Sequence, residues 1–466
     1  MKKNVINVVS LFSGCGGLDL GFEIANHAFH EFKVIWANDI FRPSCKTYSE
    51  NFGLEIYEDP NEVLEKPKIF CGDIEKIDFQ KISNGKVIDV IAGGPPCQDF
   101  SLIRGKGKRL GTKVKRGRLY SHFVRALISL QPKIFVFENV KGLVSANNGM
   151  AYKEIIEDFQ NLDVRYPEIE GNYEKLENNI IEKYEIVFSD IVDFSKLGVP
   201  QKRERLIIIG IRKDLVKKLP NDIDEIRKYV KEKLCSGNKI LSLFPITPIE
   251  IFSGESFGSL KNEYTSIMQN YKTEIEEIKS KRSVYFLKNI WSKYSFKIWE
   301  DYKFINKLNG ELNQEEVEKE HEKIMKLIGF YKKPLDRLFF DDNSNDKLVD
   351  KNHVKSRMSC IPPGENHRFV RGTEHEVAGL MSNIYKRLHP LKPSPTVIGR
   401  GGGGTWGYHY RKDRQKLTNR ERARLQTFPD YFKFKGKSSD VRRQIGEAVP
   451  PLASKIIAEF ILKIFI

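Results

Sequence analysis

A series of short apolar runs in the first 212 residues constrains the fold more than any other feature. Each run is soon followed by glycine or by a polar side chain, and helical patterns lie between most of them. Such runs predict buried strands, because parallel strands covered on both faces are apolar throughout. The pattern predicts an α/β fold with a doubly wound, mostly parallel sheet. The runs are 4–11, 33–37, 68–70, 87–91, 133–137, 184–192 and 205–211.

The strand predicted at 87–91 leads into Gly93-Gly-Pro-Pro-Cys97. The two prolines fix φ where a loop must hold a side chain still, so Cys97 is a candidate nucleophile. A small buried cysteine is the alternative. Eight of the fifteen residues from Arg104 to Arg118 are Lys or Arg, and none is acidic. This loop either closes over a phosphate backbone or is a solvated surface loop.

A glycine turn follows the first predicted strand, in the segment Phe12-Ser-Gly-Cys-Gly-Gly-Leu-Asp19. Strand, glycine turn and helix together are typical of a nucleotide-binding βα unit. The spacing is not GxGxxG, because Asp19 occupies the place of the last glycine, and a dinucleotide pyrophosphate is therefore disfavoured. After the second strand, Asp39 either bonds ribose hydroxyls or caps the next helix, and the two roles are compatible.

Further polar residues follow the third and fifth predicted strands. Asp73 could reach an adenine amino group while Ile74 packs against the ring, or Asp73 could cap a turn. Glu138 ends the strand at 133–137, where a carboxylate is costly unless it is bonded or used. Apolar neighbours would raise the pKa of Glu138 and let it carry a proton near neutral pH. A carboxylate bonded to local backbone N–H groups is the alternative.

Gln201, Arg203 and Arg205 lie at the entry to the last strand of the predicted sheet. We expect all three side chains to point at the same crevice. Arg203 and Arg205 are two residues apart in an extended segment and therefore share one face.

The charge of the chain is distributed unevenly. The net charge is +1 over residues 1–212 and +15 over residues 213–466. This asymmetry predicts one nearly neutral domain that performs chemistry and one basic domain that binds a polyanion, most simply nucleic acid. The six cysteines show no metal-ligand spacing with the histidines, so we expect no metal site and a reducing compartment. No segment is predicted to cross a membrane.

The second half contains two segments of distinct composition. The run Asp341-Asp-Asn-Ser-Asn-Asp346 is expected to form an exposed loop. Farther on, Arg400 precedes four glycines and Trp406 follows them closely. Gly401–Gly404 is either a flexible linker or a place where a phosphate strand approaches the backbone closely.

The ordered set of motifs resembles the DNA (cytosine-5)-methyltransferases of bacterial restriction-modification systems. The resemblance covers residues 5–212 and about 385–466, and it does not cover 213–384. Six blocks occur in the order of the family: Phe12-Ser-Gly-Cys-Gly-Gly17, Gly94-Pro-Pro-Cys97-Gln-Asp-Phe-Ser101, Glu138-Asn139-Val140, Gln201-Lys-Arg203-Glu-Arg205, Arg420-Glu-Arg-Ala-Arg-Leu-Gln-Thr-Phe-Pro429 and Gly446-Glu-Ala-Val-Pro450.

The resemblance implies the roles of individual residues. Cys97 would add to C6 of a flipped-out cytosine, protonated Glu138 would hold N3, Arg205 would bond O2, and Arg203 would help to order the site. The last block usually has asparagine where this chain has Glu447, which would bond the ammonium group of the cofactor or face water. Residues expected to bind the cofactor, S-adenosyl-L-methionine, are Phe12, Ser13, Gly14, Gly16, Gly17, Leu18, Asp39, Ile40, Asp73, Ile74, Pro95, Glu447 and Ala448. Residues expected to contact the substrate are Gln98, Ser101, Arg116, Gln201 and Arg400.

These inferences predict an S-adenosyl-L-methionine-dependent catalytic domain with a Rossmann-like fold, formed by residues 1–212 and 436–466. A smaller, basic target-recognition domain is predicted at 213–435. We expect a cytoplasmic bacterial monomer that acts on double-stranded DNA, paired in function with a restriction endonuclease but not in a stable complex. The alternatives are a tRNA cytosine-5 methyltransferase and a non-catalytic DNA-binding protein on the same fold.

Overall fold

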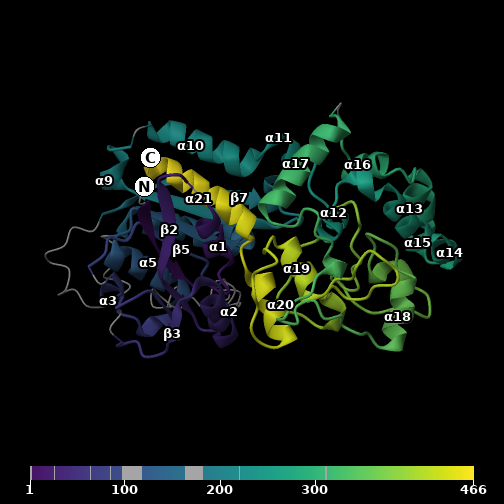
Figure 1. Cartoon of the computed structure of the whole chain (residues 1–466), viewed down its shortest axis with the longest axis horizontal. Helices are drawn as coiled ribbons and strands as arrows, with labels where there is room; N and C mark the ends of the chain where they lie inside the picture. Colours follow the sequence, from purple (N-terminus) through teal and green to yellow (C-terminus); the bar gives the residue numbers. More distant parts are fainter. Residues whose placement is uncertain are drawn as a thin grey trace. The chain divides into compact units, whose positions relative to one another are not determined.

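The chain folds into two compact units. The computed structural model describes residues 3–25, 27–62, 65–83, 85–96, 118–162, 182–219, 221–309 and 312–465 (Figure 1). The first unit comprises Met1–Asp193, Glu204–Ser236 and Ala453–Ile466, and the second comprises Phe194–Arg203 and Gly237–Leu452.

The first unit is built on a mixed sheet of eight strands in the order β3-β4-β2-β1-β5-β6-β8-β7. Only β8 runs antiparallel to its neighbours, β6 and β7, and the other pairs are parallel. The predicted α/β fold with a mostly parallel sheet is therefore confirmed. The strands are β1 (Asn4–Leu11), β2 (His30–Asp39), β3 (Glu55–Tyr57), β4 (Lys68–Cys71), β5 (Val90–Gly93), β6 (Ile134–Val140), β7 (Tyr184–Asp193) and β8 (Glu204–Arg212).

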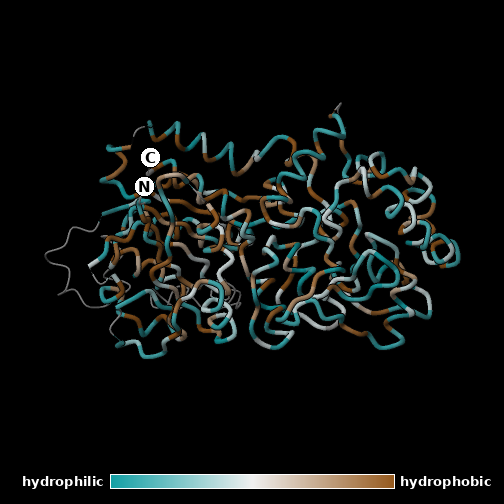
Figure 2. The backbone as a smooth tube through the Cα atoms, in the orientation of Figure 1, coloured by the Kyte–Doolittle hydropathy of each residue, from teal (hydrophilic) through white to brown (hydrophobic). Residues whose placement is uncertain are grey.

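The apolar runs form the buried centre of this sheet, and hydrophobic segments follow its strands in Figure 2. The edge strand β3 was not predicted, because its three residues are too few and too polar to form an apolar run. Aromatic rings fill the layer between the sheet and the helices α5 and α7. Phe123 lies with its ring centroid 5.3 Å from that of Phe137, in an edge-to-face arrangement.

Helices cover the sheet of the first unit. They are α1 (Gly17–Ile24), α2 (Arg42–Phe52), α3 (Phe79–Ser83), α5 (Arg118–Leu130), α6 (Gly142–Ser145), α7 (Met150–Gln160), α9 (Lys213–Val216), α10 (Ile223–Lys231) and nearly all of α21 (Pro451–Phe465). The C-terminal helix α21 packs against α1, where Ser454 donates a hydrogen bond to the carbonyl of Leu18. A side chain at Gly21 would collide with Ser454, so the two helices approach closely only because residue 21 is glycine.

The second unit consists of short helices and long connecting segments. Its helices are α11 (Lys239–Leu243), α12 (Pro248–Ser253), α13 (Lys261–Gln269), α14 (Lys272–Glu277), α15 (Lys281–Asn289), α16 (Ile298–Asn306), α17 (Gln314–Leu327), α18 (Asn352–Ser359), α19 (Asn419–Leu425) and α20 (Ser438–Glu447). In its described residues, strand pairing is limited to isolated bridges such as Arg387 with Tyr408. Helix α19 begins with a capping box, in which Thr418 accepts from the Glu421 amide and Glu421 accepts from the Thr418 amide.

The boundaries of the units differ from the domain boundaries drawn on the sequence. Residues 194–203 and 436–452 were predicted in the catalytic domain and belong to the second compact unit, whereas 213–236 belong to the first. Part of this difference arises because helix α10 packs against strand β7 of the first unit. The functions assigned to the two units stay predictions. Among the described residues, no helix is both long and apolar enough to span a bilayer.

Candidate active site

The glycine turn after β1 is tied to the end of β2 by hydrogen bonds. The amide of Ser13 donates to the Asn38 carbonyl at 2.8 Å, and the amide of Gly14 donates to Asp39 Oδ2 at 2.9 Å. The other oxygen, Asp39 Oδ1, accepts from the Phe41 amide at 2.7 Å, one residue before α2. Asp39 thus joins the two turns.

The backbone around the turn leaves room for a ligand. Gly14 has a φ of +56°, and no atom of the described residues lies within 4 Å of the position that its Cβ would take. Gly16 has a φ of +91°, and a Cβ there would lie 2.3 Å from the ring of Phe52. Phe12 adopts a φ of 54°, which is rare for a residue with a side chain. The turn therefore needs its glycines, and it opens to solvent beside Gly14.

Two residues that were predicted to contact the cofactor, Ile40 and Ile74, differ greatly in their exposure to solvent. Ile40, directly after Asp39, is 70% exposed, whereas Ile74 is buried. Asp73 precedes the short 3-10 helix η1 (Ile74–Lys76) and accepts a hydrogen bond from the Glu75 amide at 3.0 Å. Asp73 therefore caps a turn, which was one of the two roles predicted for it.

Asp19 is a buried acid behind the glycine turn, in the first turn of α1. Ser10 and Tyr48 donate hydrogen bonds to its Oδ2, at 2.7 and 3.0 Å. Burial raises the pKa of Asp19 to about 6 despite these two bonds. In the sequence, Asp19 indicates only that the dinucleotide motif is incomplete. Its spacing within α1, facing Tyr48 of another helix, is visible only in the fold.

Glu138 and Arg205 form an ion pair near the end of β6. Arg205 Nε lies 3.0 Å from Glu138 Oε1, and both side chains are largely buried. Antiparallel pairing of β6 with β8 sets this contact, because Arg205 lies opposite Val140, two residues along from Glu138. The fold thus brings together two residues that are 67 positions apart and that were both predicted to be catalytic.

The segment that leads to Cys97 lies against this pair. A Cβ at Gly94 would be 2.7 Å from Glu138 Oε2, so only glycine fits beside the carboxylate. The carbonyl of buried Pro95 accepts from Asn139 Nδ2 at 3.1 Å. Both contacts fix the backbone two or three residues before the predicted nucleophile. Cys97, Gln98, Ser101 and Arg116 themselves lie outside the described residues.

Gln201 and Arg203 are buried in the second unit. The Gln201 side chain accepts from the Val397 amide at 2.7 Å and donates to Gln426 Oε1 at 2.8 Å. Arg203 donates to the carbonyls of Gly446 and Ala448, at 3.1 and 3.0 Å. These contacts support neighbouring segments of the chain, whereas we expected the two side chains to point into a crevice.

Arg203 thus holds the C-terminal end of α20, where Glu447 is the last helical residue and Ala448 follows it. Glu447 accepts from Arg400 Nε at 2.9 Å and from Arg443 Nε at 3.1 Å. Next to Glu447, the backbone of Gly446 packs closely on that of Gly399. A Cβ at residue 446 would lie 2.1 Å from the Gly399 amide nitrogen, so only glycine fits there. The structure therefore pairs a residue predicted to bind the cofactor with one predicted to bind the substrate.

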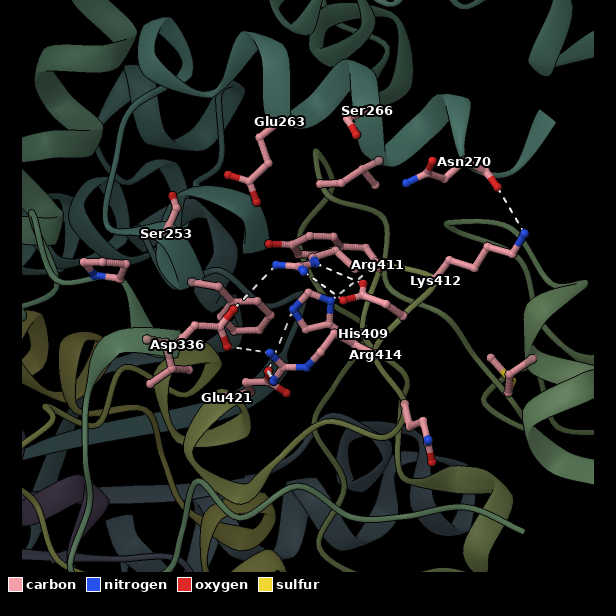
Figure 3. Close-up of a pocket in the computed structure, with 18 of the residues that line it drawn as sticks. Ser253, Glu263, Ser266, Asn270, Asp336, His409, Arg411, Lys412, Arg414 and Glu421 are labelled. Carbon is pink, nitrogen blue, oxygen red and sulfur yellow. Dashed lines mark hydrogen bonds and ion pairs between the residues drawn. The ribbon is translucent and has the colours of Figure 1, made fainter. Parts of the chain in front are cut away.

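A polar cavity of about 1040 Å³ lies within the second unit, and none of the predicted site residues that the structure describes lines it (Figure 3). Arg414 donates to Glu421 at 2.7 Å, and Arg411 forms a bidentate pair with Asp413. Burial raises the pKa of Glu421 to about 7. The cavity is lined by five aspartates or glutamates and by five lysines or arginines. These numbers are equal, so the charged side chains give the cavity no preference for an anion. Acids and bases that line it are Glu263, Asp336, Asp350, Asp413, Glu421, Arg337, Lys355, Arg411, Lys412 and Arg414.

The described residues contain no cluster of three or more metal-ligating side chains. The groups brought together in the first unit are instead a glycine turn with a capping aspartate and a Glu–Arg pair beside a rigid Gly-Pro turn. Such a site can bind a nucleoside next to a general acid.

Comparisons with known proteins agree with this chemistry. A family profile described as C-5 cytosine-specific DNA methylase matches residues 6–463. The DNA (cytosine-5-)-methyltransferase M.ApeKI of Aeropyrum pernix is 48% identical over 98% of each chain. The type II methyltransferase M.NgoFVII of Neisseria gonorrhoeae is 32% identical over 100% of this chain and 88% of its own.

One solved structure is similar in fold along nearly the whole chain. It is a prophage-encoded E. coli protein described as a DNA modification methyltransferase, with a TM-score of 0.55 and 22% identity. The likeness covers 99% of both chains. At this identity the comparison concerns the fold alone.

Proposed function

This chain belongs to the C-5 cytosine-specific DNA methylase family, and on that premise we propose how its residues perform cytosine-5 methylation of DNA. The substrate is a cytosine flipped out of a specific short sequence of double-stranded DNA. When bound, S-adenosyl-L-methionine supplies the electrophilic methyl group. The observation that carries the proposal is the Glu138–Arg205 pair, 3.0 Å apart beside the turn that leads to Cys97.

The chain's own residues activate the base. Cytosine C5 is a poor nucleophile, so the Cys97 thiolate forms a bond to C6 and shifts electron density to C5. Glu138 in its acid form donates to N3, and Arg205 donates to O2, which offsets charge as the thiolate adds. After methylation, loss of the C5 proton restores the double bond and breaks the Cys97–C6 bond. Rigid placement of Gly94 and Pro95 supports the approach of the thiol.

The residues around the β1 turn fit the nucleoside part of the cofactor. Open space beside Gly14 admits a ligand close to the backbone. Asp39 lies at the carboxyl end of β2, where an acid can meet ribose hydroxyls, and exposed Ile40 offers an apolar surface to the adenine. Arg203 acts indirectly, by holding the Gly446–Ala448 segment. We assign Glu447 to the positioning of Arg400, since the two side chains are paired.

We further propose that the enzyme protects host DNA as the partner of a restriction endonuclease. The relatives M.NgoFVII and M.BbvI are named type II methyltransferases, and this supports the proposal. The enzyme would act as a monomer in the bacterial cytoplasm, without a stable complex with the endonuclease.

The test is transfer of labelled methyl groups from S-adenosyl-L-methionine to unmethylated double-stranded DNA, followed by mapping of the modified cytosines. We expect label at one short recurring sequence. Cys97→Ala should abolish transfer and keep DNA binding, while the control Cys235→Ala should retain full activity. Glu138→Gln should slow transfer by roughly 10²- to 10⁴-fold. Label in bulk tRNA alone would move the mechanism to another substrate, and no label anywhere would refute the enzyme proposal.

A further inference from the structure

Helix α18 (Asn352–Ser359) differs from its neighbours in charge. From Lys351 to Gly364 the chain contains no acidic residue, whereas it contains Lys351, Lys355 and Arg357. In contrast, α17 (Gln314–Leu327) carries five glutamates and three lysines. A helix surface without acids suits a polyanionic partner, and a mixed surface such as that of α17 suits solvent.

The orientation of α18 is fixed by its inner face. Val354 and Met358 lie one turn apart on this face, and both are buried within the second unit. Arg357 Nε donates to the His375 carbonyl at 2.7 Å, and its guanidinium lies 5.0 Å from the centre of the Tyr385 ring. A helix held on one face in this way presents a defined set of side chains on the other.

That outer face carries the side-chain types that read base edges. Asn352, His353, Lys355 and Ser356 are exposed. Among the residues that the structure describes, none hydrogen-bonds the side chains of Asn352, His353 or Lys355. Asn pairs with adenine and Lys with guanine in the major groove, which is wide enough to admit an α-helix.

Helix α18 is also connected, through contacts of Tyr385, to the glycine-rich segment 401–404. The Tyr385 amide donates to the Gly404 carbonyl at 2.7 Å, so Arg357, Tyr385 and Gly404 form an unbroken series of contacts. The segment 401–404 follows Arg400, which is predicted to contact the substrate. Lys355 is in addition one of the residues that line the polar cavity of the second unit.

We propose that α18 enters the major groove of the DNA and that Asn352 and Lys355 help to determine the target sequence. The proposal rests on the proposed function, since it names the part of the chain that selects the cytosine to be methylated. Helix α18 itself carries no acid that would repel phosphates, and the inner-face contacts fix the position of the helix before binding. A recognition helix that is already folded and anchored loses less entropy on binding, which favours affinity.

The experiment measures binding to two duplexes of equal length, one with the sequence mapped for the wild-type enzyme and one with that sequence scrambled. Asn352→Ala should weaken binding to the mapped duplex by roughly tenfold and leave the scrambled duplex unchanged, because a base contact is lost. Lys355→Ala should weaken binding to the mapped duplex more than to the scrambled one. The control, Lys319→Ala with Lys323→Ala on α17, should change neither affinity.

A second measurement identifies the groove. Methylation of guanine N7 by dimethyl sulfate blocks major-groove contacts, and at some position in the mapped site it should reduce wild-type binding more than binding by Lys355→Ala. Equal losses on both duplexes, unchanged affinities, or identical interference patterns would overturn the proposal. Circular dichroism verifies that each variant is folded. Failure of the proposed function is a separate result, because the wild-type enzyme would then transfer no methyl group to DNA.

Discussion

The two units satisfy their buried backbone groups by different means. In the first unit, eight strands pair the carbonyl and amide groups of the core with one another. In the second unit, buried arginine side chains take the place of strands. Arg387 is fully buried and donates to the carbonyls of Met358, Ile361, His409 and Arg411, at 2.5 to 3.0 Å. A guanidinium with five donors can join several irregular segments at one point.

This difference teaches where each unit is vulnerable. In a sheet the hydrogen bonds are made by the backbone groups of many residues. Replacing one side chain therefore removes few of these bonds. An arginine that joins four carbonyls makes all four hydrogen bonds with one side chain, so its loss removes a donor from every one of these carbonyls at once. We therefore expect single substitutions to be more damaging in the second unit than in the first.

The largest effect is expected for Arg387→Met. The substitution keeps much of the apolar stem but removes a buried donor from four carbonyls, so the free energy of unfolding should fall by about 4 kcal/mol. Hydrogen exchange should accelerate in α18 and in residues 405–415, while β1 and β5 stay protected. The control Arg368→Met removes a single bond to the exposed Leu380 segment and should cost less than about 1 kcal/mol. Equal loss of protection in both units would contradict the comparison.

The next largest effect concerns the buried pair of His321 and Glu250 in the second unit. His321 Nδ1 faces Glu250 Oε1 at 2.9 Å and Nε2 faces the Phe244 carbonyl at 2.7 Å, so both nitrogens carry protons. Burial lowers the pKa of His321, but the carboxylate and the carbonyl outweigh burial and raise it above its ordinary value. His321→Gln should cost about 3 kcal/mol at pH 6.

The pH dependence of this effect has a definite sign. A raised pKa means that the folded protein holds the proton more tightly than the unfolded chain. The stabilisation is complete below a pH of about 6.5 and is lost as the pH rises through the folded pKa. Urea unfolding at several pH values should therefore show a wild-type stability that declines with pH relative to His321→Gln. A constant difference from pH 6 to pH 10 would show that the ring is neutral.

A smaller effect is expected for Asp39→Asn in the first unit. The amide retains one acceptor oxygen but places an NH₂ group against the amide of Gly14 or of Phe41, which should cost about 1.5 kcal/mol. The sheet itself should stay intact. Measurement is by urea unfolding without cofactor. Asp59→Asn is the control, because the exposed Asp59 has only one such bond, to Asn61, and a loss as large as that of Asp39→Asn would argue against the assigned joining role.

The smallest effect is expected for Tyr57→Phe, also in the first unit. Buried Trp36 donates to the Tyr57 hydroxyl at 2.7 Å, and the substitution leaves that donor without its acceptor. The expected loss is about 1 kcal/mol. Tyr152→Phe removes a hydroxyl that contacts Ser189 in a half-buried place, so water should replace it at nearly no cost. If Tyr57→Phe cost as much as Arg387→Met, the proposed contrast between the units would fail.

Local patterns predicted the first unit well. Every apolar run of the sequence became a strand, because burial on both faces selects such runs regardless of distant residues. The candidate residues at the ends of β1, β2 and β6 follow directly, since parallel strands share one carboxyl edge. Prediction failed for β3, whose pairing with β4 rather than its composition makes it a strand.

Prediction was weaker in the second unit, where contacts depend on distant segments. The run 341–346 was expected to be exposed, yet Asp342 and Ser344 are buried. Asp342 accepts from Arg420 Nη2 at 2.8 Å, and Ser344 Oγ accepts from Arg420 Nε at 2.9 Å. No local pattern indicates that an acid 78 positions earlier will meet this arginine. The same reason hides the burial of Gln201 and Arg203.

The sequence by itself determined the α/β fold, the family and the set of candidate residues, because these depend on local periodicity and on short motifs. Only the tertiary structure decided which residues meet. It paired Glu138 with Arg205, placed Asp39 between two turns, and joined Glu447 to Arg400. The physical reason is that an ion pair or a shared hydrogen bond depends on distances of about 3 Å, and strand register and helix packing set such distances between residues far apart in the chain.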